Sequence, residues 1–367
     1  RHTALPEPGG ERELGVVVSR LHSNALDRSR PLWEIHLIEG LEGDRFAFYL
    51  KLHHALVGGI NAIPMFLKQL SASARSRNMA PPWTIPLENP VSGPRDFDPL
   101  ETASSLGKAG LGLLRNGLSR SRSGSFVVPR GAPYSTLNRA ITAQRRFATW
   151  QFEQPRIERV AAATDSTVNE ILTFLCGSSL RRFFKEYNAL PDESLVGLIP
   201  VSLQERGEHN PGGAIAAIRV ELGTQIGNPV ARLEAVKGSI AQVREDRQSL
   251  PEDAANSYAL LRAAPILMSQ ARTVGRLVPP LFNLHISNTP GEEKPLYFNG
   301  ARLEAVYPLT QLMQYTALSI DCVSYAGTLN IGFTGARDTL PHLQRMAVYL
   351  GPVSYTHLTL PTTIKPW

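Results

Sequence analysis

The sequence contains only two cysteines, Cys176 and Cys322, among 367 residues. Two thiols cannot build a disulfide scaffold or a zinc site made only of thiolates. Both lie among apolar residues, so we interpret them as small core residues in a protein of a reduced, cytoplasmic compartment. We find no run of about 18 apolar residues and no secretory leader, so the sequence predicts neither a transmembrane helix nor a signal peptide.

Charged residues are also scarce, at 19%, while 43% of the residues are hydrophobic. This balance excludes a disordered chain. The 29 glycines and 28 prolines favour a loop-rich globular protein over a helical bundle or a fibre. At roughly 150 residues per domain, the length predicts two domains.

Acidic residues are absent between positions 102 and 152, although the whole chain carries a net charge of +6. Eight basic residues lie in that stretch: Lys108, Arg115, Arg120, Arg122, Arg130, Arg139, Arg145 and Arg146. An anionic membrane surface, a phosphorylated ligand or nucleic acid could bind it, and a solvated basic linker is the alternative. Because no nucleic-acid-binding motif or interleaved aromatic residues accompany it, we predict no nucleic-acid partner.

Hydrophobic periodicity and turn residues predict a mixed α/β chain. Strands are predicted within 34–52 (two, joined by a turn), and over 146–152, 195–203, 214–222, 283–288, 315–324 and 327–334. Helices are predicted over 60–71, 167–187, 229–246, 252–275 and 339–350, the second starting with a capping box at Thr167 and Glu170. The order lacks a regular βαβ alternation, so we expect mixed or antiparallel sheets.

Composition divides the chain into four parts. We predict an N-terminal domain over 1–72, a basic linker rich in Pro, Ser and Arg over 73–140, a C-terminal domain over 141–350 and an unrelated tail over 351–367. Within the linker, residues 103–118 could form an amphipathic helix. Such a helix could lie at a membrane surface or pack on the protein itself.

The most informative local pattern is HHALVGG at positions 53–59. An apolar strand ends on His53 and His54, and the pair Gly58 and Gly59 lets the chain turn into a helix. Neighbouring strand residues point to opposite faces, so one histidine can face a cleft as a base while the other packs. Two metal ligands would need same-face spacing and a third partner, so we predict no metal.

Five segments together resemble the bacterial wax ester synthase/diacylglycerol acyltransferase family, a branch of the CoA-dependent acyltransferases. They are PLWE at 31–34, HHALVGG at 53–59, TVNE at 167–170, SNTPG at 287–291 and PLYFNGA at 295–301. Their order matches that of the family, and the resemblance spans about residues 13–350. It implies a two-domain fold of mixed and antiparallel sheets with a cleft or tunnel between the domains.

The resemblance also implies a reaction. His54 would be the general base that deprotonates an acceptor hydroxyl, which attacks the thioester of a fatty acyl-CoA without an acyl-enzyme. Asn288 would supply or position an oxyanion donor, although it could also only shape a turn. His53, Gly58 and Gly59 would support the loop. Acyl-CoA is then a substrate rather than a cofactor, and no residue that binds the substrates is identified.

Diacylglycerol or a long-chain alcohol would be the acceptor. The insoluble product implies a cytoplasmic protein with peripheral contact to the inner membrane or a lipid inclusion. Two positions depart from the family pattern: Gly58 replaces an aspartate, and Glu170 replaces the usual aspartate. The family's opening strands would precede residue 1. The alternative functions are a catalytically weakened or inactive homologue that acts as a lipid-surface binding protein, and a relative of peptide-condensation domains.

Overall fold

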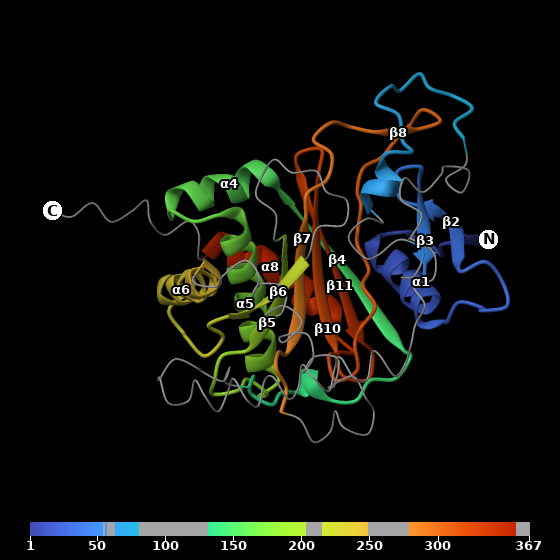
Figure 1. The fold of residues 1–367 in the computed structure, drawn as a ribbon. Helices are drawn as coiled ribbons and strands as arrows, with labels where there is room; N and C mark the ends of the chain where they lie inside the picture. Colours follow the sequence, from blue (N-terminus) through green and yellow to red (C-terminus); the bar gives the residue numbers. More distant parts are fainter. Residues whose placement is uncertain (54–55, 57–62, 81–130, 203–214, 249–278, 357–367) are drawn as a thin grey trace, which may run out of the picture.

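The computed structural model describes residues 1–53, 56, 63–80, 131–202, 215–248 and 279–356. Their strands form two larger sheets and one two-stranded sheet. A three-stranded sheet belongs to the N-terminal part, and a six-stranded main sheet belongs to the C-terminal part (Figure 1). The mixed α/β class predicted from the sequence is confirmed.

The N-terminal unit consists of β1 (His2–Ala4), α1 (Glu11–Ser23), β2 (Trp33–Leu41) and β3 (Arg45–Leu52). The strands lie in the order β1-β2-β3, with a parallel pair followed by an antiparallel pair. Helix α1 places Leu14, Val17, Val18 and Leu21 in one buried cluster with Ile38 and Tyr49 of the sheet. We did not predict this helix, although its i, i+3, i+4, i+7 spacing is a readable signal.

The main sheet has the order β4-β11-β10-β7-β5-β6. Its strands are β4 (Arg145–Glu153), β5 (Val196–Ser202), β6 (Ile215–Glu221), β7 (Leu284–Thr289), β10 (Leu318–Tyr325) and β11 (Thr328–Ala336). The two neighbour pairs β10–β7 and β7–β5 are parallel and the other three are antiparallel, so the sheet is mixed as predicted. Each predicted strand of this sheet agrees with an observed one to within three residues at either end.

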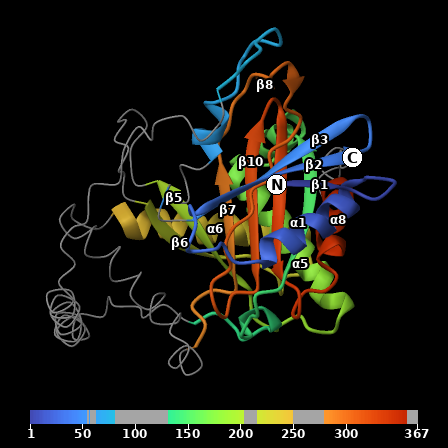
Figure 2. The same cartoon turned by 90° about the vertical axis from the view of Figure 1, so that its right-hand side faces the viewer.

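Four helices lie on one side of the main sheet, and the N-terminal unit lies on the other (Figures 1 and 2). These helices are α4 (Gln154–Ala163), α5 (Val168–Glu186), α6 (Pro229–Gln248) and α8 (Leu343–Thr356). The large core on the α5 side includes alternate residues of β7 and β10, among them Leu284, Ile286, Ile320 and Cys322. Both cysteines are buried and free, as the sequence predicted.

Helix α5 begins with the predicted capping box. The Thr167 backbone N–H donates to Glu170 Oε2 at 2.7 Å, and the Glu170 N–H donates to Thr167 Oγ1 at 3.2 Å. Two backbone donors at the helix start are thereby satisfied. Because Glu170 performs this task, its side chain is buried in spite of its charge. The cap fixes Asn169 in the first turn of the helix.

Other elements were not predicted, namely β1, α1, α4 and the small pair β8 (Tyr297–Phe298) and β9 (Ala301–Arg302). The helices predicted over 103–118 and 252–275 lie outside the described residues. The domain boundaries stay predictions. Residues 131–140 of the predicted linker do place Leu137 in the large core, and α8 continues beyond residue 350 to Thr356. Among the helices that the structure describes, none is long and apolar enough to cross a membrane.

Candidate active site

The strand that leads into the histidine pair is held at its end by β2. The backbone N–H of His53 donates to the Leu32 carbonyl at 2.9 Å, so the PLWE segment lies directly beside the histidine motif. His54, Gly58 and Gly59 lie outside the described residues. The site is therefore built from the segments on either side of them.

Lys51 ties the same strand end to the end of α1. Its Nζ donates to the carbonyls of Leu21 at 2.7 Å and Asn24 at 2.6 Å. Carbonyls at a helix C-terminus lack intrahelical partners and carry partial negative charge, which an ammonium group balances. Partial burial lowers the pKa of Lys51 from its ordinary value, with the nearby Glu34 opposing the shift. The strand end that leads into the histidine motif is therefore held in place by these hydrogen bonds.

The segment that follows the motif is fixed to the C-terminal part of the chain. Residues 63–67 are helical. Leu67 is buried in a cluster with Leu296 and Tyr325. Ser71 and Tyr297 then exchange two backbone hydrogen bonds of 2.9 and 2.8 Å. The described segments that precede and follow the histidine motif are therefore held by β2 and by the chain just after SNTPG, respectively.

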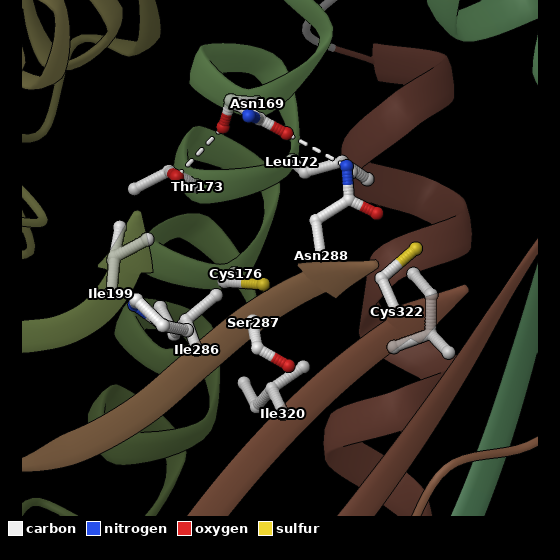
Figure 3. Close-up of a pocket in the computed structure, with 12 residues that line it drawn as sticks. Asn169, Leu172, Thr173, Cys176, Ile199, Ile286, Ser287, Asn288, Ile320 and Cys322 are labelled. Carbon is white, nitrogen blue, oxygen red and sulfur yellow. Dashed lines mark hydrogen bonds between the residues drawn. The ribbon is translucent and has the colours of Figure 1, made fainter. Parts of the chain in front are cut away.

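Asn288 lies where β7 runs toward the start of α5. Its Nδ2 donates to Asn169 Oδ1 at 2.7 Å, and Figure 3 shows the two amides facing one another. This contact joins SNTPG to TVNE, which are far apart in the sequence. One N–H of Asn288 is used for the pair, and its amide has a second one. The oxyanion role assigned to Asn288 stays a prediction, and the structure adds a partner that orients it.

A small pocket opens between α5 and the strands β5, β7 and β10 beside this amide pair (Figure 3). Its lining is mainly apolar and includes Leu172, Cys176, Ile199, Ile286, Ile320 and Cys322. Burial raises the pKa of the Cys176 thiol to about 12 and also raises that of the Cys322 thiol. A protonated thiol is a poor nucleophile, so neither cysteine is prepared to carry an acyl group.

Two residues near the predicted site were missed from the sequence. Asn169 lies within the TVNE segment, and its place in the first turn after a capping box was the available signal. Asp321 is buried on β10 and accepts a hydrogen bond from Ser287 of the SNTPG segment at 2.8 Å. No local pattern marks Asp321. In the part of the chain that the structure describes, no three His, Cys, Asp or Glu side chains could share a metal ion.

The fold and the joined motifs place the chain among the CoA-dependent acyltransferases. Residues 1–172 match the family model described as the wax ester synthase/diacylglycerol acyltransferase catalytic domain, and residues 212–352 match the WS/DGAT C-terminal domain. The chain belongs to this wax ester synthase/diacylglycerol acyltransferase family. The resemblance stated from the motifs is confirmed.

Individual relatives agree with this assignment. A Mycobacterium tuberculosis protein named as a diacylglycerol O-acyltransferase, Rv3480c, is 38% identical over 96% of this chain and 79% of its own length. The M. tuberculosis protein tgs2, also named as a diacylglycerol O-acyltransferase, is 35% identical over 95% of this chain and 78% of its own.

Two solved structures resemble this chain to different degrees. The wax ester synthase/diacylglycerol acyltransferase of Marinobacter aquaeolei VT8 superposes with a TM-score of 0.80 at 34% identity, over 98% of this chain and 79% of that one. The first condensation domain of the CDA synthetase, at 16% identity and a TM-score of 0.50, shares the fold.

Proposed function

We propose that the chain transfers a fatty acyl group from acyl-CoA to the hydroxyl of diacylglycerol or a long-chain alcohol. The observation that carries this proposal is the joining of distant motif segments. PLWE contacts the histidine motif through the hydrogen bond between His53 and Leu32, and SNTPG contacts TVNE through Asn288 and Asn169. The pairing between Ser71 and Tyr297 then connects the two groups.

His54 is the general base of the proposed reaction. It removes the proton of the acceptor hydroxyl, the oxygen attacks the thioester carbonyl, and the tetrahedral intermediate collapses with release of the CoA thiol. A neutral imidazole suits this step because its reference pKa is near ~6.5. The CoA thiol, with a pKa near ~8.5, leaves readily, and His54 returns the proton to it.

Asn288 is the donor proposed for the oxyanion that forms on the thioester carbonyl. The Asn169 amide supports this role because it occupies one Nδ2 hydrogen and fixes the plane of the Asn288 amide. A preorganised donor stabilises developing charge without reorganisation during the step. The buried, protonated thiols of Cys176 and Cys322 support direct transfer between the two substrates.

Peripheral contact with a membrane or lipid inclusion completes the proposal. It is supported by six basic residues between 102 and 139, a set that leaves out the partly buried Arg145 and Arg146 of β4, and by the insolubility of a triacylglycerol or wax ester product. Each basic residue near an anionic bilayer contributes about 1 kcal/mol, and salt screens this attraction. Binding to anionic vesicles should therefore weaken as salt is raised.

Acyl transfer from labelled palmitoyl-CoA to diacylglycerol and to hexadecanol, offered in parallel, tests the function. We expect His54→Ala to lower turnover by about 10²- to 10⁴-fold with an unchanged melting temperature, because it removes the base. His53→Ala is the matched control and should act mainly through stability.

Two results would contradict this account. If His53→Ala is the inactive variant and His54→Ala turns over normally, the base is misassigned. If the unaltered chain binds lipid vesicles but transfers no acyl group, the loss of aspartate at Gly58 has left a lipid-surface binding protein.

A further inference from the structure

A buried carboxylate lies on the face of the main sheet opposite α5. Asp321 is 2% exposed. Its Oδ1 accepts a hydrogen bond from Ser287 Oγ at 2.8 Å, and its Oδ2 accepts one from Ser319 Oγ at 2.7 Å. Across the parallel pair β10–β7, Asp321 is opposite Ser287 and Ser319 is opposite His285. The four side chains therefore form two adjacent polar rungs.

The rungs fix the orientation of His285. Its Nδ1 lies 3.2 Å from Ser319 Oγ and 3.5 Å from Asp321 Oδ1. The Ser319 hydroxyl donates its one hydrogen bond to Asp321, so Ser319 Oγ can only accept a hydrogen bond from the ring. Nδ1 of His285 therefore carries a hydrogen. A ring whose single N–H is on Nδ1 presents the lone pair of Nε2. No described group is hydrogen-bonded to Nε2, and the His285 side chain is 22% exposed.

Stability does not explain this arrangement. A buried carboxylate costs several kcal/mol to desolvate, and apolar replacements for buried ionic groups are often neutral or stabilising. On the other face of the same strands, the positions are filled by residues such as Ile286, Ile320 and Cys322. Strand alternation places the polar rungs on the face opposite this core, and the N-terminal unit lies on that side of the sheet (Figure 1).

The neighbouring strand β11 carries a further buried hydroxyl that lacks a hydrogen-bond partner among the described residues. Thr334 of β11 is opposite Ser319 and fully buried, and its Oγ1 has no hydrogen-bond partner among the described residues. Ser287 immediately precedes Asn288 in the chain. Since neighbouring strand residues point to opposite faces, the side chain of Ser287 lies on the other side of the sheet from that of Asn288. A polar, incompletely satisfied strip therefore runs across the face of the sheet that is turned away from α5.

We propose that His285 Nε2 is a subsite that accepts a hydrogen bond from a substrate hydroxyl, and that Asp321 is the positioning residue that fixes the ring. This inference rests on the proposed function. The hydroxyl has two sources, the acceptor lipid or alcohol and the pantetheine arm of acyl-CoA. Michaelis constants measured separately for the two substrates distinguish them.

Two substitutions at His285 separate the contribution of Nδ1 from that of Nε2. His285→Asn keeps an amide near the position of Nδ1 and removes Nε2, whereas His285→Gln carries an amide to the position of Nε2. We expect His285→Asn to raise the KM of one substrate about tenfold, the effect of one lost hydrogen bond near the upper end of its usual range. Its kcat should stay within about twofold, and His285→Gln should recover most of the loss.

Asp321→Asn tests the positioning role. We expect it to raise the same KM by a smaller factor, and the double variant with His285→Asn to be no worse than His285→Asn alone, because Asp321 acts through the ring. A merely structural carboxylate would change the melting temperature and leave both KM values unaltered.

The outcomes separate this inference from the proposed function. Folded His285 variants that keep both KM values, a fall in kcat at constant KM, or additive effects in the double variant would overturn the subsite while transfer by the unaltered chain stands. An unaltered chain without transfer activity would refute the proposed function, and the subsite with it.

Discussion

Mild acid should destabilise the junction between α1 and β3 because His22 is buried in its neutral form. The His22 Nδ1 lies 2.9 Å from the Tyr49 hydroxyl. Burial, followed by the positive charges of Lys51 and Arg145, lowers the pKa of His22 from 6.5 to about 4. The folded protein therefore resists protonation at this position.

The size and sign of the effect follow from linkage. The shift from 6.5 to about 4 is about 2.5 units, which at 1.36 kcal/mol per unit corresponds to about 3 kcal/mol. The unfolded chain takes up the proton below pH 6.5 and the folded chain only near pH 4. The contribution is therefore complete above pH 6.5, decreases as the pH falls, and is fully lost below about pH 4. The total free energy of unfolding of a typical domain is only about 5–15 kcal/mol.

Denaturant titrations at several pH values between 7.5 and 4.5 measure this loss as the free energy of unfolding. His22→Asn is the matched variant because it keeps a polar acceptor near the position of Nδ1 and does not titrate. We expect the unaltered chain to lose about 2–3 kcal/mol more than His22→Asn over this range. Equal pH dependence of the two proteins would show that another group controls the acid response.

Three further predictions concern the site. Lys51→Met keeps the aliphatic stem but removes the hydrogen bonds to the carbonyls of Leu21 and Asn24 at the end of α1. Because the side chain is only partly buried, the variant should lose about 1–2 kcal/mol of stability in a denaturant titration, and its turnover should fall as well. Unchanged turnover would show that the histidine motif does not need this anchor. Asn169→Ala and Asn288→Ala should each lower kcat, and the double variant should be no slower than the worse single variant because the amides act as a pair; additive losses would contradict that. Gly58→Asp should raise the transfer rate without changing the preferred acceptor, because a loop displaced by about 1 Å can cost roughly a hundredfold in rate. An equally stable Gly58→Asp variant that is no faster would show that the missing aspartate does not limit the transfer rate.

Local sequence signals predicted much of the fold. The capping box at Thr167 fixed the start of α5, and alternation of apolar residues located β4 and β10 to within three residues. These features depend on interactions between near neighbours, which the sequence displays directly. Helix α1 carries the same kind of signal in Leu14 and Val17, so its omission was an error of interpretation.

Long-range contacts could not be predicted in this way. Asn169 and Asn288 meet because β7 ends beside the start of α5, and Asp321 meets Ser287 because β10 is the parallel neighbour of β7. Strand order is decided by packing of the whole sheet, so no local pattern indicates these partners. The motif resemblance identified the segments of the site but not which segments touch.

The order of strands in the main sheet has a consequence for biosynthesis. Strand β4 lies at the edge of that sheet and pairs with β11, so that Glu153 is opposite Thr328. During synthesis, β4 therefore leaves the ribosome long before its partner exists. Pairings of such long sequence separation are slow, and the apolar face of a waiting strand is prone to aggregate. We expect the nascent chain to need chaperone protection until β11 emerges.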